Sequence, residues 1–266
     1  MRFCVCIAVT VSMLLCASTQ AQLRYKDVFM SRLRNGIVVF LPEELPQGKS
    51  VDGQLLREIA KRHPGDLPVY TLLAMDNKGF LKVEIARFHA AVSGQQASTS
   101  DKVRYGIVLF LDWLDTHPQP SAVQDFRGLW EALKWLEAGY EETASPFVGY
   151  MLAMAYRQDA PRMNLWKGRD VLSNTLQKML SSSLWRRITE TKGPSERPAP
   201  EEVAASVPPP QRRVVKYLLT VYRQWLLTRV WLETAEPGKP RVRKQVRPTK
   251  EEEQLAKYLE QVIARL

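Results

Sequence analysis

Two pairs of carboxylates occur at the spacing of one helical turn, which places both acids of a pair on the same face of a helix. The pairs are Asp112 with Asp115 and Glu137 with Glu141. Glycoside hydrolases need only one or two such acids in a cleft, as general acid, base or nucleophile. The polar side of an amphipathic helix has the same spacing, and we expect that non-catalytic role for all four residues.

Motifs for metal and nucleophile chemistry are missing. The segment RLRNGIVVFLP, residues 32–42, resembles the first strands of insulinase-type zinc peptidases, which bind zinc through an inverted His-x-x-Glu-His motif. That motif is absent, because none of His63, His89 and His117 has a second ligand at helical spacing. Serine-hydrolase, P-loop and dinucleotide-binding motifs are absent too. We therefore expect no metal site, no cofactor and no catalytic residue.

Residues 1–21 have the features of an export signal. Arg2 precedes an apolar run of about 15 residues, and Thr19-Gln20-Ala21 has the small-x-small pattern of a cleavage site. The run is short for a membrane anchor, which needs roughly 20 apolar residues. We expect cleavage after Ala21, a mature chain without a transmembrane span, and a periplasmic or secreted protein.

All cysteines lie within this expected signal, at Cys4, Cys6 and Cys16. The mature chain would then have no thiol for a disulfide, a thiolate zinc site or a catalytic cysteine. A packed core must stabilise it instead, and residues 22–266 are enough for one large domain or two smaller ones.

Positive charge is concentrated near the C-terminus. The chain has a net charge of +10, and residues 211–266 contain 13 basic against 6 acidic residues. Such an asymmetry indicates an anionic partner, although basic segments also serve solubility alone.

Six of these basic residues occur without an intervening acid. They are Lys239, Arg241, Arg243, Lys244, Arg247 and Lys250. Pro240 and Pro248 predict extended chain here, and the partner could be an unknown protein, lipid headgroups of an envelope surface, an acidic polymer or nucleic acid. The alternative is a solvated connector whose charge is partly offset by residues 251–253.

Residues 22–95 should form a small α+β portion with one or two β-hairpins. Asn35-Gly36 between apolar runs is typical of a type I′ turn. The Asp-Asn-Lys-Gly sequence at residues 76–79 predicts a second hairpin across residues 69–88, with a helix over 85–92 as the alternative. Ser50 should cap a helix over residues 51–63.

Residues 100–191 should form a helical domain, because apolar residues recur at helical spacing. The expected helices cover residues 101–116 after Ser100 as N-cap, begin at Ser121 in a capping box with Gln124, begin at Pro146, and cover residues 169–188. The helix from Pro146 is apolar nearly all round and should be buried.

The remaining residues are expected to contain a linker and a basic helical segment. Residues 192–210 contain six prolines, which favours a loop or linker. Residues 211–266 follow as a basic C-terminal helical segment, with one helix from Gln211 to Ala235 and a last helix that begins with a Thr249–Glu252 capping box. Tryptophans at helical spacing are usually core anchors, but Trp225 and Trp231 lie on the most basic of these helices.

The sequence thus predicts a mainly α protein with about five to seven helices. It favours an exported, non-catalytic binding or scaffold protein whose basic C-terminal region contacts an anionic partner or surface. The alternative is a cell-envelope polysaccharide hydrolase or lytic enzyme that uses carboxylates.

Overall fold

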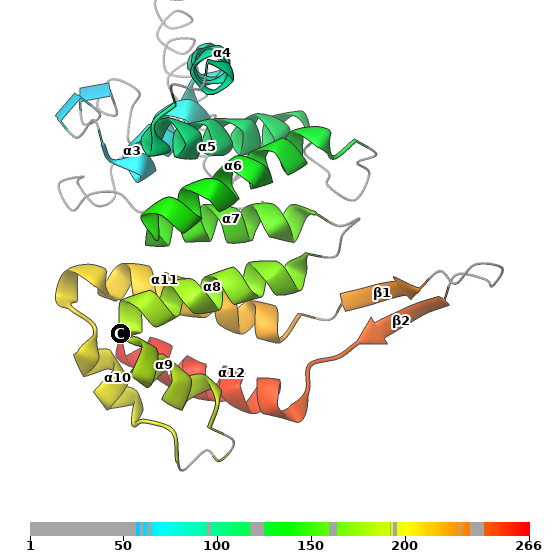
Figure 1. Ribbon diagram of the computed structural model, residues 1–266. Helices are drawn as coiled ribbons and strands as arrows, with labels where there is room; N and C mark the ends of the chain where they lie inside the picture. Colours follow the sequence, from blue (N-terminus) through cyan, green and yellow to red (C-terminus); the bar gives the residue numbers. More distant parts are fainter. Residues whose placement is uncertain are drawn as a thin grey trace, which may run out of the picture. The chain divides into compact units, whose positions relative to one another are not determined.

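Contacts between the elements divide the chain into two units, Met1–Pro118 and Gln119–Leu266. Figure 1 labels helices α3 to α12 and strands β1 and β2. The computed structural model describes residues 57–58, 61–62, 65–94, 97–117, 125–159, 164–191, 193, 196–228, 230–234 and 242–266.

The described part of the first unit consists of α3 (Leu67–Asp76), α4 (Lys78–Ser93) and α5 (Thr99–Thr116), which pack on one another. Helix α5 agrees with the predicted helix over 101–116, but its N-cap is Ser98 and not Ser100. Ser98 and Asp101 form a capping box, and the hydrogen bond that the Ser98 hydroxyl donates lowers the pKa of Asp101.

The hairpin predicted across residues 69–88 is wrong, because these residues lie in α3 and α4. Asn77 Oδ1 accepts a hydrogen bond of 3.0 Å from the backbone N–H of Phe80, so the turn-like sequence is a helix cap. The short apolar alternation was ambiguous between strand and helix. In α4 it leaves Leu81 buried and Val83 65% exposed.

The hairpin predicted at Asn35-Gly36 lies outside the described residues, and so does Ser50. Of the helix predicted over 51–63, residues 57, 58, 61 and 62 are described, and all four are helical.

A buried polar network joins α3 to α4. The Glu84 carboxylate accepts hydrogen bonds from the Tyr70 hydroxyl at 2.9 Å and from Arg87 Nη2 at 2.7 Å. Burial, and then the charge of Glu84, raise the pKa of Tyr70. A buried carboxylate is tolerated when it is paired in this way, so we assign Glu84 a structural role.

In the second unit, helix α7 (Pro146–Gln158) packs between α6 (Arg127–Thr143) and α8 (Leu165–Leu180). Its residues from Val148 to Tyr156 are all buried, which confirms the expected buried helix and its start at Pro146. Helix α6 begins at Arg127 rather than at Ser121, because residues 125–126 are not helical.

The single helix predicted over 169–188 is two helices, α8 and α9 (Ser182–Thr189). Between them Ser181 has a φ of 73°, which interrupts the helix, and its hydroxyl accepts from the backbone N–H of Leu184. The sequence did not predict this break, because the apolar spacing continues through it: Leu172, Leu176 and Leu184 are all buried.

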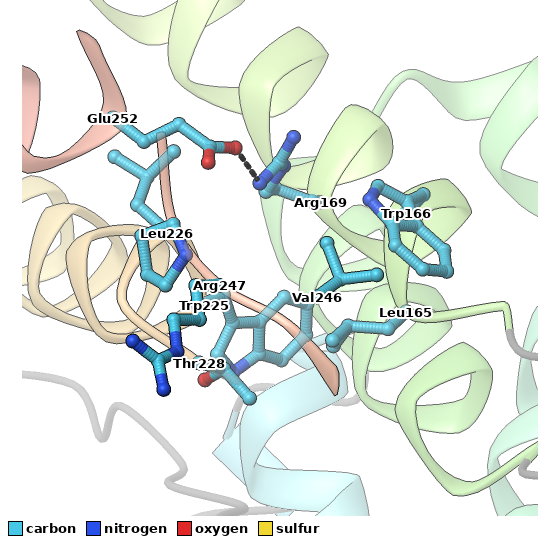
Figure 2. Close-up of a pocket in the computed structure, with 10 residues that line it drawn as sticks. Leu165, Trp166, Arg169, Trp225, Leu226, Thr228, Val246, Arg247 and Glu252 are labelled. Carbon is cyan, nitrogen blue, oxygen red and sulfur yellow. Dashed lines mark hydrogen bonds and ion pairs between the residues drawn. The ribbon is translucent and has the colours of Figure 1, made fainter. Parts of the chain in front are cut away.

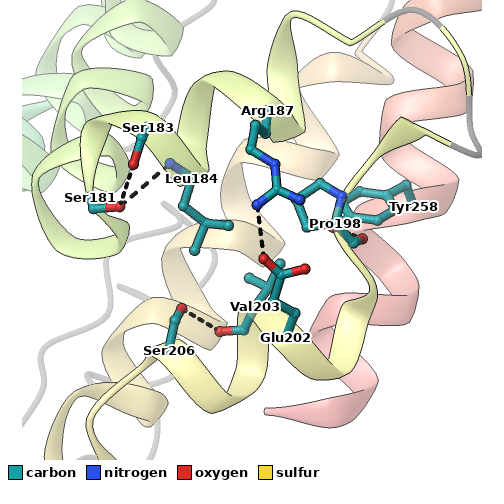
Figure 3. A network of polar contacts seen from close by, with 9 residues as sticks. All are labelled: Ser181, Ser183, Leu184, Arg187, Pro198, Glu202, Val203, Ser206 and Tyr258. Atoms are coloured by element: carbon teal, nitrogen blue, oxygen red, sulfur yellow. Dashed lines mark hydrogen bonds and ion pairs between the residues drawn. The ribbon is translucent and has the colours of Figure 1, made fainter.

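The proline-rich segment 192–210 contains α10 (Pro200–Ser206) and the start of the 3₁₀ turn η4 (Pro209–Gln211). Polar contacts connect α10 and the chain before it to neighbouring helices (Figure 3). Arg187 of α9 forms an ion pair with Glu202 of α10 at 2.8 Å, and the Tyr258 hydroxyl donates a hydrogen bond to the Pro198 carbonyl at 2.9 Å. Val203 is fully buried. The described part of this segment is therefore packed against its neighbours.

Helix α11 (Arg212–Leu226) ends well before Ala235, which corrects the predicted helix from Gln211. Strands β1 (Val230–Thr234) and β2 (Val242–Val246) follow as an antiparallel pair, with Val230 opposite Val246 and Thr234 opposite Val242. β-Branched residues at both ends of each strand favour this pairing. Helix α12 (Lys250–Arg265) then begins with the predicted Thr249–Glu252 capping box.

The expectation of a mainly α protein is confirmed for the described residues. They include ten α-helices, more than the five to seven expected, because the second hairpin, the helix over 169–188 and the proline-rich segment were each interpreted as other structure. Within the described ranges, no helix combines the length and the apolar character that crossing a bilayer requires.

Candidate functional site

The carboxylates Asp112 and Asp115 are half-buried on α5. Asp115 lies 3.7 Å from the Lys78 ammonium of α4. Burial, and then the charge of Asp115, raise the pKa of Asp112. Asp112 is therefore the perturbed member of the pair, whereas Asp115 contacts a cation of the neighbouring helix.

The two acids of the second pair, Glu137 and Glu141, differ in burial. Glu137 is half-buried and accepts a hydrogen bond from the Tyr156 hydroxyl of α7, whereas Glu141 is exposed. Burial of Tyr156 and this hydrogen bond raise the pKa of its hydroxyl. Glu137 thus joins α6 to α7, and none of the four acids lines the two pockets described below.

The two histidines that the structure describes, His89 and His117, do not form part of a ligand set. His89 is exposed on α4, the His117 ring stacks on Trp113 at the end of α5, and His63 lies outside the described residues. Across the part of the chain that the structure describes, no three His, Cys, Asp or Glu side chains come together in a way that could hold a metal ion.

The six basic residues of the predicted binding tract fall into three groups. Lys239 and Arg241 lie outside the described residues. Arg243 and Lys244 belong to β2, opposite Glu233 and Leu232 of β1. Arg247 and Lys250 are exposed where the chain passes from β2 into α12. The tract is therefore part of a hairpin and a helix start, not only extended chain.

A small pocket lies where this hairpin joins α12 (Figure 2). Its free volume is about 40 Å³, which is enough for a few water molecules or one small functional group. The residues that line it come from α8, from the end of α11 and the chain after it, from the end of β2, and from the start of α12 with the chain before it: Leu165, Trp166, Arg169, Trp225, Leu226, Thr228, Val246, Arg247, Pro248 and Glu252.

Trp225, which lines this pocket, has a buried indole N–H. Its side chain is 2% exposed, and no described residue accepts a hydrogen bond from its Nε1. Trp185, equally buried, donates to Ser173 Oγ at 2.9 Å. Leaving a buried donor unpaired costs about 1–3 kcal/mol. An acceptor that entered the pocket and reached Trp225 Nε1 would recover part of this free energy.

Arginines surround the same indole. The Arg157 guanidinium lies 5.6 Å from the Trp225 ring centroid, and Arg169 and Arg247 line the pocket. Arg169 Nη1 donates to Glu252 Oε1 at 2.6 Å, the contact drawn in Figure 2. Arg247 makes no hydrogen bond or ion pair with any described residue. The surroundings of Trp225 thus have more cations than carboxylates to pair with them, which favours an anionic ligand.

The second pocket has mixed charge. Residues of α9 and the chain after it line this open depression: Arg186, Arg187, Glu190, Thr191, Gly193 and Glu196. Close by, Arg197 is 8% exposed and donates from Nη2 to the Thr191 carbonyl at 3.1 Å. Because both signs of charge line it, this pocket favours neither an anion nor a cation.

Sequence reasoning identified Arg247, Lys250 and Trp225 as residues of interest but missed Arg169 and Trp166. Arg169 reaches the pocket through a contact with Glu252, 83 residues further along the chain. No local pattern in the sequence indicates this pairing, because it depends on how α8 packs against the helices that follow.

Comparison of the chain with models of known protein families, with curated proteins and with solved structures found no match.

Proposed function

We propose that this protein is an exported, non-catalytic binding protein whose basic C-terminal region contacts an anionic partner. The partner is a protein or an anionic envelope surface. The binding region comprises the six basic residues of the tract, Lys239, Arg241, Arg243, Lys244, Arg247 and Lys250.

The observation that carries this proposal is the state of the two tract residues whose side chains are described. Arg247 and Lys250 are exposed, and neither forms an ion pair with a described residue. The connector alternative needs the neighbouring glutamates to offset the tract. Glu252, however, pairs with Arg169 and also accepts from the backbone N–H of Thr249. Glu252 is therefore engaged elsewhere, which leaves only Glu251 and Glu253 of these glutamates to offset the charge of the tract.

The alternative function, a carboxylate enzyme acting on polysaccharide, has one observation in its favour. The pKa of Asp112 is raised by burial and by Asp115, which is the direction of shift that a general acid needs. Neither residue lines a described pocket, and Asp115 contacts Lys78. A polysaccharide-cleaving activity that Asp112→Asn abolishes, with helicity retained, would replace the binding proposal with this one.

The test is co-sedimentation of the full chain with phosphatidylglycerol vesicles and with immobilised poly-L-glutamate at low salt. Replacing the six tract residues by glutamine should reduce binding to at least one of these surfaces. Each basic residue near an anionic membrane contributes at most about 1 kcal/mol, so the loss should be large when all six are replaced.

A matched variant separates location from total charge. It replaces six exposed basic residues outside the tract by glutamine: Arg127, Lys134, Lys178, Arg186, Arg213 and Lys257. We expect this variant to retain most of the binding. Equal loss in both variants would show that net charge alone is responsible, and unchanged binding of the tract variant would reject the proposal.

A further inference from the structure

We propose that the pocket beside Trp225 binds one carboxylate of an acidic polypeptide partner. This inference rests on the proposed binding function and names the chemical group through which the partner would be recognised. Three observations support it: two hydrogen-bond donors without a described acceptor, the small size of the pocket, and a carboxylate–guanidinium contact among the residues that line it.

The first donor is Trp225 Nε1, which is buried and has no acceptor among the described residues. The second is Arg247, whose exposed guanidinium lines the same pocket and has no described partner. An indole and a guanidinium donate hydrogen bonds and accept none. A ligand must therefore supply acceptors, and the charge of Arg247 favours an anionic acceptor over a neutral one.

The size and lining of the pocket favour a carboxylate on a short aliphatic stem. The free volume is about 40 Å³, which excludes a sugar ring or a whole lipid headgroup. Leu165, Trp166 and Val246 supply apolar wall, and Figure 2 shows the Trp225 indole among the side chains that line it. An Asp or Glu side chain has both parts, a methylene stem for this wall and two oxygens for the donors.

The pocket wall already contains one carboxylate–guanidinium contact. Glu252 Oε1 accepts from Arg169 Nη1 at 2.6 Å. This pair neutralises Arg169 and leaves Arg247, with the Trp225 N–H, to a second carboxylate. The Arg157 guanidinium, 5.6 Å from the centroid of the Trp225 ring, adds to the positive potential.

The experiment follows the indole N–H signals of the full chain by ¹H–¹⁵N correlation NMR. Trp225→Phe identifies the Trp225 signal by its loss. We expect poly-L-glutamate to shift this signal and to leave that of Trp185 in place, since the Trp185 N–H already has Ser173 as its acceptor. Arg247→Gln should weaken poly-L-glutamate binding by roughly 10-fold, the effect of losing one charge-assisted hydrogen bond.

Arg213→Gln is the matched control, because Arg213 is also exposed but lies at the other end of α11. It should leave the affinity within about 2-fold of the parent, as expected for an isolated surface charge. If Trp225→Phe does not fold, the comparison of these two arginine variants still tests the site, because both side chains are exposed.

Three results would overturn the inference. Binding of poly-L-glutamate without a shift of the Trp225 signal would place the contact elsewhere and leave the proposed function intact. A shift with short-chain phosphatidylglycerol but not with poly-L-glutamate would make the ligand a lipid phosphate. Binding to neither probe would reject the proposed function as well.

Discussion

Asp112 is a carboxylate that α5 holds partly out of water, and its raised pKa gives a test of stability against pH. A folded-state pKa above the unfolded value means that the protonated form is favoured by folding. This contribution to stability is present below the unfolded pKa and is lost as the pH rises through the folded pKa. Asp112→Asn should therefore raise the free energy of unfolding at pH 7 relative to the parent, and by less at pH 3.

Chemical denaturation at the two pH values measures this difference. Glu141→Gln serves as the control, because Glu141 is exposed on α6 and should change stability little at either pH. A less stable Asp112→Asn at pH 7 would contradict the prediction and show that the charged carboxylate has a stabilising partner.

Trp225 and Trp185 form a matched pair for a second prediction. Both are 2% exposed, but only Trp185 has a described acceptor for its N–H, Ser173. Replacing either by phenylalanine removes similar volume, whereas Trp185→Phe also loses a hydrogen bond. Trp185→Phe should therefore lower the free energy of unfolding by about 0.5–1.5 kcal/mol more than Trp225→Phe does.

Urea denaturation of both variants in dilute buffer, without an anionic probe, measures this difference. A larger loss for Trp225→Phe would mean that its N–H is already paired in the free protein, and the pocket would lose its buried donor.

Spacing in the sequence predicted which helices carry the carboxylates, but it did not predict which residues the carboxylates contact. The acids were expected on helices and Asp112, Asp115 and Glu137 lie there. The contacts of Asp115 with Lys78 of α4 and of Glu137 with Tyr156 of α7 were not expected, because no spacing within α5 or α6 indicates them.

Close packing of α7 against α8 depends on glycine at position 168. A Cβ on Gly168 would lie 2.9 Å from the Ala153 carbonyl oxygen and 3.1 Å from the Trp225 ring. Gly168→Ala should thus lower the free energy of unfolding by about 1–3 kcal/mol, the usual effect of overpacking. Thermal unfolding measures this loss, with Gly65→Ala as control because nothing lies within 4 Å of a Cβ there.

Equal melting temperatures for Gly168→Ala and the parent would contradict this packing. The prediction also concerns the pocket, since the clash involves Trp225 directly. The variant should therefore change the environment of this indole, and its assigned NMR signal should move in the absence of any ligand.

Helices with a cap and a long apolar row could be predicted from the sequence. Helix α12 begins with the expected Thr249–Glu252 capping box, and α7 begins at the expected Pro146. Prediction failed where tertiary contacts decide. Asn77 caps a helix although the sequence around it is typical of a turn. Pro198, before α10, accepts a hydrogen bond from Tyr258 of α12, which is far along the sequence.

The whole molecule carries its positive charge unevenly, and export would bring this charge to the cell envelope. Residues 1–21 predict removal after Ala21, because a short apolar run precedes small residues at the cleavage site. The mass of the intact protein recovered from the exported fraction should correspond to a chain that begins at Gln22. Recovery of membrane-embedded protein that retains Met1 would contradict both the cleavage and the export.

The central claim is that the basic C-terminal region binds an anionic partner through charge. Its most direct measurement is the affinity of the full chain for poly-L-glutamate as salt is raised from about 50 to 500 mM, where screening shortens the Debye length severalfold. The proposal predicts binding at low salt that weakens steadily, and that glutamine in place of Lys239, Arg241, Arg243, Lys244, Arg247 and Lys250 removes most of the salt dependence. An affinity that does not change with salt, or no binding even at the lowest salt, would contradict it.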